Sequence, residues 1–314
     1  MRLLGLYAAL AACGGPGALP PPSTVAIKTP PPPPPPPPCI TPPDDVATIT
    51  HASGGTASVQ YCIGTAVDQC FALELGTARL TRLSAPPPPQ PPGLEDTAHV
   101  ETTNPELKVC KSDGCKTLTP QVWPGAAPLH AATNGSVAVV LLGDADAGRG
   151  YADVYDVLKT KRLASFRYAH GDYRCGEVAM LGDTIYIGAN TCNAPAGRGA
   201  LYSAKGHKIA NVGGRDFGTY GNAFTQVDAH TWAFLGENGV HVALQDVVKG
   251  KVLKTIDVKE LFGAAPMGNP GESAIVRLGA GKLGVIAGTP ANGSVAVVDI
   301  ASGDVHVVRA PLCQ

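Results

Sequence analysis

The chain has 314 residues, with 24 basic and 25 acidic side chains and a formal net charge of −1 at pH 7. Both signs are spread along the sequence without a basic arm or face, so nucleic acid is excluded as an expected partner. No apolar run after the N-terminal leader reaches the length of about 18 residues that a membrane-spanning helix needs.

The N-terminus has the pattern of a secretory signal. Met1-Arg2 supplies one positive charge, and Leu3–Ala12 is an unbroken run of apolar or small residues. The run ends in Leu10-Ala11-Ala12-Cys13, which resembles the lipobox of bacterial lipoproteins, a Leu-small-small-Cys pattern. The resemblance implies that Cys13 is acylated and becomes the mature N-terminus. The alternative is an ordinary cleaved secretion signal with an incidental cysteine.

The resemblance also implies a location. Gly14-Gly15 after the cysteine contains no aspartate of the kind that retains lipoproteins in the inner membrane, which favours the outer membrane, on its periplasmic or surface face. Residues 14–43 contain the run Pro30–Pro38, which predicts a polyproline II rod of about 28 Å. We therefore predict a signal peptide over 1–13, a proline-rich spacer over 14–43 and one folded domain over 44–314.

From residue 45 onward the sequence predicts short β-strands separated by Gly, Asn and Asp, with one helical turn at Val258–Phe262. A unit of four strands recurs in residues 177–212, 222–258 and 273–308. The second strand of each unit is expected near residues 57, 97, 136, 184, 231 and 282. A period of about 45 residues with four strands is typical of a β-propeller blade, so we predict about six four-stranded blades. The alternative is another all-β arrangement of the sandwich type.

The third and fourth strands of several units form a hairpin of one style. It appears at Val295–Val305, Val154–Leu163 and Phe71–Leu80. The pattern resembles quinoprotein-like and YVTN-type propellers, whose blades end in apolar-x-apolar-Asp-x-x-Ser/Thr-Gly-x-apolar. The sequence contains no Trp-Asp pair of the WD40 type, and neither Gly-His nor Gly-Gly recurs once per unit as in WD40 and kelch propellers. The resemblance implies a propeller fold and leaves its function open.

Eight cysteines remain after Cys13, and an even number in an exported chain indicates disulfides. Two pairs flank short turns between predicted strands, a third pair brackets two strands, and the last two cysteines lie at the ends of the domain. No Cys-x-x-Cys pair supports the rival interpretation as a zinc site. The expected disulfides are Cys62–Cys70, Cys110–Cys115, Cys175–Cys192 and Cys39–Cys313.

Two segments that join the fourth strand of one unit to the first strand of the next combine aromatic and charged residues. Propellers gather such loops on one face, and rigid scaffolds commonly present binding groups on loops. We therefore expect a binding surface there. The alternative is that the Arg and Asp side chains pair with one another and the aromatic rings cap the fold. The expected ligand-binding residues are His170, Asp172, Tyr173, Arg174, Arg215, Asp216, Phe217 and Tyr220.

The sequence does not predict catalysis, a cofactor or a metal. It contains no Gly-x-Ser-x-Gly elbow and no phosphate-binding Gly-x-x-x-x-Gly-Lys loop. Asp144–Gly148 resembles the start of a calcium loop but lacks its third carboxylate. We predict a monomeric, non-catalytic binding module for a protein or glycan, held in the cell envelope by a lipid anchor. The alternatives are a scaffold in envelope assembly, or an enzyme (hydrolase, lyase or quinone-dependent dehydrogenase) that uses His170 with nearby charged residues.

Overall fold

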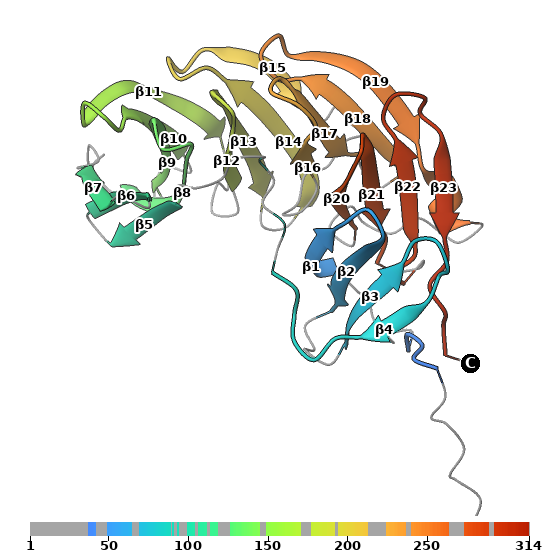
Figure 1. Cartoon of the computed structure of the whole chain (residues 1–314). Helices are drawn as coiled ribbons and strands as arrows, with labels where there is room; N and C mark the ends of the chain where they lie inside the picture. Colours follow the sequence, from blue (N-terminus) through green and yellow to red (C-terminus); the bar gives the residue numbers. More distant parts are fainter. Residues whose placement is uncertain are drawn as a thin grey trace, which may run out of the picture. The chain divides into compact units, whose positions relative to one another are not determined.

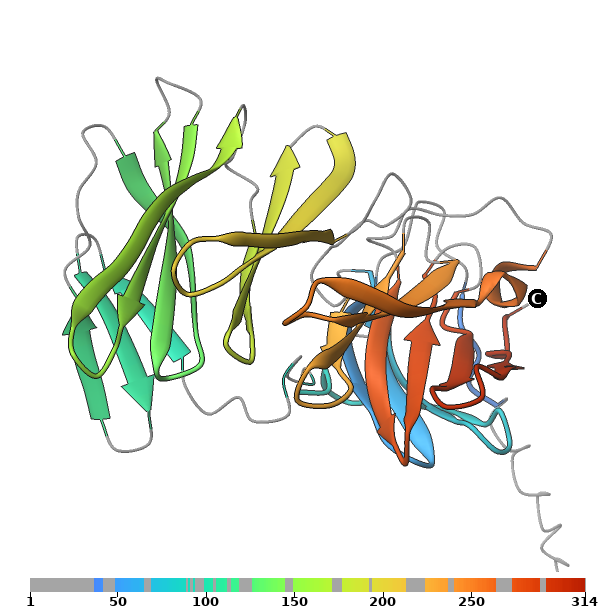
Figure 2. The ribbon, with the colours of Figure 1, turned by 90° about the horizontal axis from the view of Figure 1, so that it is seen from above.

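The part of the chain that the computed structural model describes forms six antiparallel β-sheets (Figure 1). Each sheet uses one consecutive stretch of the chain, so each has its own range of colours in Figure 2. The described part contains no helix that is long and apolar enough to cross a membrane. The described residues are 37–41, 49–64, 69–88, 90, 93, 99–103, 106–111, 114–118, 126–144, 149–170, 177–191, 194–212, 224–236, 240–263, 273–288 and 292–313.

Five sheets have four strands in chain order, and the second sheet has three described strands. The first three sheets are β1 (Ile49–Gly54), β2 (Ser58–Ile63), β3 (Cys70–Glu74) and β4 (Leu80–Arg82); β5 (His99–Thr103), β6 (Glu106–Lys111) and β7 (Gly114–Leu118); and β8 (Ala126–Thr133), β9 (Val137–Asp144), β10 (Arg149–Asp156) and β11 (Lys161–His170). The last three are β12 (Glu177–Leu181), β13 (Thr184–Thr191), β14 (Ala194–Tyr202) and β15 (Lys208–Val212); β16 (Phe224–Gln226), β17 (Thr231–Leu235), β18 (His241–Asp246) and β19 (Lys251–Asp257); and β20 (Ala274–Gly279), β21 (Lys282–Ile286), β22 (Val295–Asp299) and β23 (Val305–Val308).

From the second sheet to the sixth, each sheet packs face to face on the next through buried apolar side chains, and the sixth packs on the first. The strands are rich in Val, Ile, Leu and Ala, which fit a sheet buried between two neighbours. Radial repetition of four-stranded sheets that pack in this way is the β-propeller architecture, which confirms the predicted fold. Representative pairs in the five core clusters are Tyr61 with Ile286, Leu235 with Val285, Tyr186 with Trp232, Val139 with Ile187, and Leu107 with Val140.

In the third, fifth and sixth blades, the turn between the third and fourth strands is built around an aspartate. The Asp299 carboxylate accepts hydrogen bonds from the backbone N–H groups of Ala301 (3.0 Å) and Ser302 (2.9 Å). Asp156 and Asp246 likewise accept from the N–H group three residues further on, at 3.0 and 2.9 Å. These backbone hydrogen bonds lower the pKa of all three carboxyls, because they stabilise the charged form. The aspartate of the predicted hairpin pattern therefore has a structural role.

The same turns place one residue in the left-handed region of the backbone. Its φ is +86° at Gly303, +69° at Gly250 and +51° at Thr160. A Cβ atom added at Gly250 would lie 2.5 Å from the Cβ of Ala210, which belongs to β15 of the preceding blade. Glycine at this turn position therefore relieves backbone strain and also allows the turn to lie against the neighbouring blade.

The N- and C-terminal ends of the propeller are joined to each other. The compact part of the chain that contains the propeller begins at Pro37. A disulfide links Cys39 to Cys313, as the sequence predicted. Beside it, the N–H group of Ile40 donates to the carbonyl of Pro311 and that of Cys313 donates to the carbonyl of Ile40, both at 2.9 Å. Ile40 is fully buried in the core between the first and sixth blades, so the junction is covalent, hydrogen-bonded and apolar at once.

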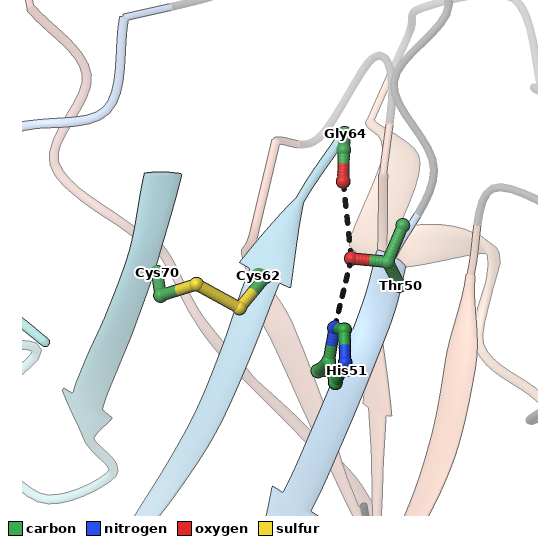
Figure 3. The surroundings of a disulfide bond; sticks show 5 residues. All are labelled: Thr50, His51, Cys62, Gly64 and Cys70. Atoms are coloured by element: carbon green, nitrogen blue, oxygen red, sulfur yellow. Dashed lines mark hydrogen bonds between the residues drawn. A yellow bond between two sulfur atoms is a disulfide. The ribbon is translucent and has the colours of Figure 1, made fainter. Parts of the chain in front are cut away.

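Two further predicted disulfides are confirmed. Cys62 and Cys70 are directly opposite each other on β2 and β3, and Cys110 and Cys115 occupy the same relation on β6 and β7. Figure 3 shows that the end of β2 is also tied to β1, since the Thr50 hydroxyl donates to the carbonyl of Gly64 at 3.0 Å. His51 Nδ1 lies 3.3 Å from the same hydroxyl. The predicted pair Cys175 and Cys192 lies outside the described residues.

The second blade departs from the predicted register. A second strand was expected near residue 97, but β5, which begins at His99, is the inner strand of its sheet, next to β8. The middle strand β6 begins at Glu106. The predicted helical turn at Val258–Phe262 is confirmed as the short 3-10 helix η3 (Lys259–Phe262).

The proline-rich segment between the first two blades is anchored to two strands at Gln90. The backbone N–H of Gln90 donates to the carbonyl of Ala52 at 2.9 Å. Its side-chain amide donates to the carbonyls of Gly54 (3.3 Å) and Arg277 (3.2 Å), and its side-chain oxygen accepts from the N–H of Arg277 (2.6 Å). These carbonyls belong to β1 and β20, the first strands of the first and sixth sheets. Gln90 therefore bridges the inner edges of these two blades.

Candidate functional site

The eight residues that the sequence indicates for ligand binding belong to two connections, between β11 and β12 and between β15 and β16. Both connections join the fourth strand of a blade to the first strand of the next. His170 is the last residue of β11, and its side chain lies outside the described part. The remaining seven lie wholly outside the described residues: Asp172, Tyr173, Arg174, Arg215, Asp216, Phe217 and Tyr220. Their role stays a prediction.

A cavity of about 580 Å³ lies at the opposite ends of the strands, where the first strand of a blade turns into the second. The turns of the third, fourth and fifth blades line it, and each contributes a polar side chain: Asn134, Asp183 and His230 respectively. Its volume is in the range of pockets that hold small ligands. We call this space the turn cavity.

Asn134 fixes the geometry between the third and fourth blades. Its side-chain oxygen accepts hydrogen bonds from the backbone N–H groups of Ser136 (3.0 Å) and Val137 (2.8 Å), which orients the amide. Its side-chain nitrogen then donates to the carbonyl of Gly182 and to Oδ1 of Asp183, both at 3.0 Å. The Asp183 carboxylate is thus held in place by a neighbouring blade.

The turn of the fifth blade is built by Asp228. Its carboxylate accepts from the backbone N–H groups of His230 (2.9 Å) and Thr231 (2.8 Å). Burial acts to raise the pKa of Asp228, but these hydrogen bonds outweigh it and the pKa is lowered. The carbonyl of His230 accepts from the N–H of Val247 at 2.9 Å, which brings the exposed side chain of Val248 to the rim of the cavity.

The walls of the turn cavity are partly apolar. Trp232 and Leu181 are buried, Met180 is half-buried, and all three line the space. The proline-rich segment reaches the same wall at Gly93, where an added Cβ would lie 4.0 Å from the Trp232 ring. Arg277 holds this segment through a hydrogen bond of 3.1 Å from its guanidinium to the carbonyl of Gly93.

Asp183 is the only acidic residue among the described residues that line the cavity. The described part of the chain places no lysine or arginine within ion-pair distance of it. Within the same part, no group of three or more His, Cys, Asp or Glu residues is arranged to hold a metal ion. The site therefore combines one oriented carboxylate with further polar side chains and apolar walls, an arrangement suited to binding.

No sequence motif marks these residues as a site. Asn134-Gly135 alone indicates a β-turn, and neither Asp183 nor His230 belongs to a chemical motif. The available signal was positional, since each of the three turns joins the first to the second strand of a predicted unit. Corresponding turns of adjacent blades lie on one face, so their polar residues could have been grouped.

No family model matches the chain, and no curated protein matches it either. Among solved structures, the chain is similar to the β-propeller domain of Cps50 (Swd1) from Myceliophteria thermophila, with a TM-score of 0.40, 10% identity, and coverage of 81% of this chain and 84% of that one. It is also similar to hydrazine synthase from Kuenenia stuttgartiensis (0.37, 13%, 82% and 78%) and to Hsv2 from Kluyvelomyces marxianus (0.39, 10%, 81% and 73%). The class of the protein follows from its own sheets: a disulfide-linked six-bladed β-propeller.

Proposed function

We propose that this chain is a non-catalytic binding module of the cell envelope that holds a protein or glycan partner against the turn cavity. The observation that carries the proposal is the cavity itself, which three consecutive blades build with oriented polar side chains. Turns on a rigid propeller keep their relative positions, so a partner meets a preformed surface and little ordering is needed on binding.

The envelope location is supported by the three disulfides of the described part, because disulfides persist in oxidising compartments. It is further supported by the resemblance of the leader to a lipobox, with Cys13 as the acylated residue. We infer a monomer anchored by lipid in the outer membrane, with the proline-rich spacer between anchor and propeller. The turn aspartates fit the hairpin pattern of quinoprotein-like and YVTN-type propellers, which we propose as its structural relatives.

The test is affinity capture from a cell-envelope extract with the propeller as bait. Ala229 is exposed in the fifth-blade turn and lines the cavity, so Ala229→Trp fills the space without removing a hydrogen bond of a side chain. Ala301→Trp makes the same change in an exposed turn of the sixth blade and serves as the matched control. We expect the partner to be lost with Ala229→Trp and retained with Ala301→Trp. Capture that is unaffected by Ala229→Trp would contradict the proposed site.

A further inference from the structure

We propose that the turn cavity receives a positively charged side chain, the lysine or arginine of a protein partner. This inference rests on the proposed function, because it names the chemistry by which the binding module recognises its partner. It follows from three properties of the cavity: the sign of its charge, the orientation of that charge, and the apolar walls beside it.

The charge of the cavity comes from Asp183. Its carboxylate is exposed to solvent at the cavity wall, and among the described residues its side-chain hydrogen bond comes from the neutral amide of Asn134. That bond engages Oδ1, and no described basic side chain neutralises the group. A ligand with an anionic group would be repelled here, whereas an ammonium or guanidinium group gains an oriented acceptor.

The orientation of the carboxylate is independent of any ligand. Asn134 is itself fixed by two backbone N–H groups of its own turn and bonds the carbonyl of Gly182 as well as Asp183. The acceptor therefore keeps its place before a partner arrives, and binding does not have to restrict its rotation. Such preorganisation raises affinity without additional contacts.

The walls match the rest of a basic side chain. Lys and Arg carry their charge on an apolar stem of three or four methylene groups, which packs on apolar surface while the head stays polar. Met180 and the 52%-exposed Val248 supply such a surface on the same cavity as Asp183. A neutral glycan has no cationic group to pair with Asp183, so the charge of the cavity favours a protein partner.

The inference is tested with small probes in place of the partner: N-acetyl-lysine amide, N-acetyl-arginine amide, and the uncharged N-acetyl-norleucine amide of similar length. The indole N–H signal of Trp232, which lines the cavity, reports binding by NMR in a Trp123→Phe background. We expect the two basic probes to bind up to about fivefold more tightly than the norleucine probe, the effect of a partly exposed ion pair.

Asp183→Asn removes the charge and keeps an oxygen for Asn134, so the turn is preserved. Its matched control is Asp304→Asn, which removes one exposed aspartate from the sixth blade. We expect the basic probes to lose about fivefold in affinity with Asp183→Asn and to be unchanged with Asp304→Asn. Equal binding of the basic and norleucine probes, or basic-probe affinity that is indifferent to Asp183→Asn, would overturn the inference.

The outcomes separate this inference from the proposed function. If capture of the envelope partner depends on Ala229 while the basic probes are insensitive to Asp183→Asn, the binding module stands and the charge preference is wrong. If capture does not depend on Ala229 while the probes still bind through Asp183, the cavity recognises basic groups and the proposed partner surface is wrong.

Discussion

Removing the disulfide between the two ends of the propeller is expected to be the most costly loss of a cross-link in the described part of the chain. In the chain-entropy model, the stabilisation that a disulfide gives increases with the logarithm of the number of residues in the loop that it closes. Cys39 and Cys313 are separated by 274 residues, Cys62 and Cys70 by 8, and Cys110 and Cys115 by 5. The model gives about 5.6 kcal/mol for the long loop and about 2–2.5 kcal/mol for each short one.

The assay is equilibrium unfolding in urea under non-oxidising, non-reducing conditions, with both cysteines of a pair replaced by alanine. Paired replacement avoids an unpaired thiol, and alanine avoids placing a hydroxyl at the buried positions of β2 and β3. We expect the double variant of Cys39 and Cys313 to lose roughly twice the unfolding free energy of either hairpin variant. A smaller loss than that of Cys110→Ala with Cys115→Ala would refute the reasoning that the bridge acts by joining distant ends.

Three further predictions concern turns and the proline-rich segment. Thr160→Gly is expected to raise the unfolding free energy by up to about 1 kcal/mol in urea, because the residue has a positive φ, whereas Gly250→Ala lowers it, since the new Cβ would meet β15. The carboxyl of Asp299 has a pKa below its ordinary 3.8, so its contribution is present above that pH and lost as the pH falls through the lower, folded-state value. Unfolding measured from pH 7 to 2 should be less pH-dependent in Asp299→Asn, and an unchanged profile would contradict this. Gln90→Ala removes the bridge between β1 and β20, so it should lower the unfolding free energy by about 1–3 kcal/mol and accelerate proteolysis between the first two blades. An unchanged rate of proteolysis would contradict the role of Gln90 as an anchor of this segment.

The local features of the fold were predictable from the sequence. The disulfides at Cys62–Cys70 and Cys110–Cys115 follow from cysteines that flank a short turn, and a cross-strand pair is the only geometry that such a spacing favours. The hairpins of the last three blades follow from turn residues between β-branched runs. In each case the interacting residues are near in sequence, so the pattern contains the contact.

The features that were missed depend on contacts between distant parts of the chain. The bridge at Gln90 could not be predicted, because its partners at Gly54 and Arg277 lie in the first and last blades. The second blade was misregistered by one strand, because the run expected as its second strand is β5, the inner strand that lies next to β8. The turn cavity joins residues of three blades, and no local motif marks Asp183 or Asn134 as members of one site.

The most direct test of the central claim is site-specific photo-crosslinking in intact cells. A benzophenone amino acid replaces Ala229 at the turn cavity, Ala301 at the control turn, or Phe217 in the loop between β15 and β16. The account predicts a crosslinked adduct from position 229 and none from position 301. An adduct from position 217 with none from 229 would contradict it and would place the binding surface on the inter-blade loops.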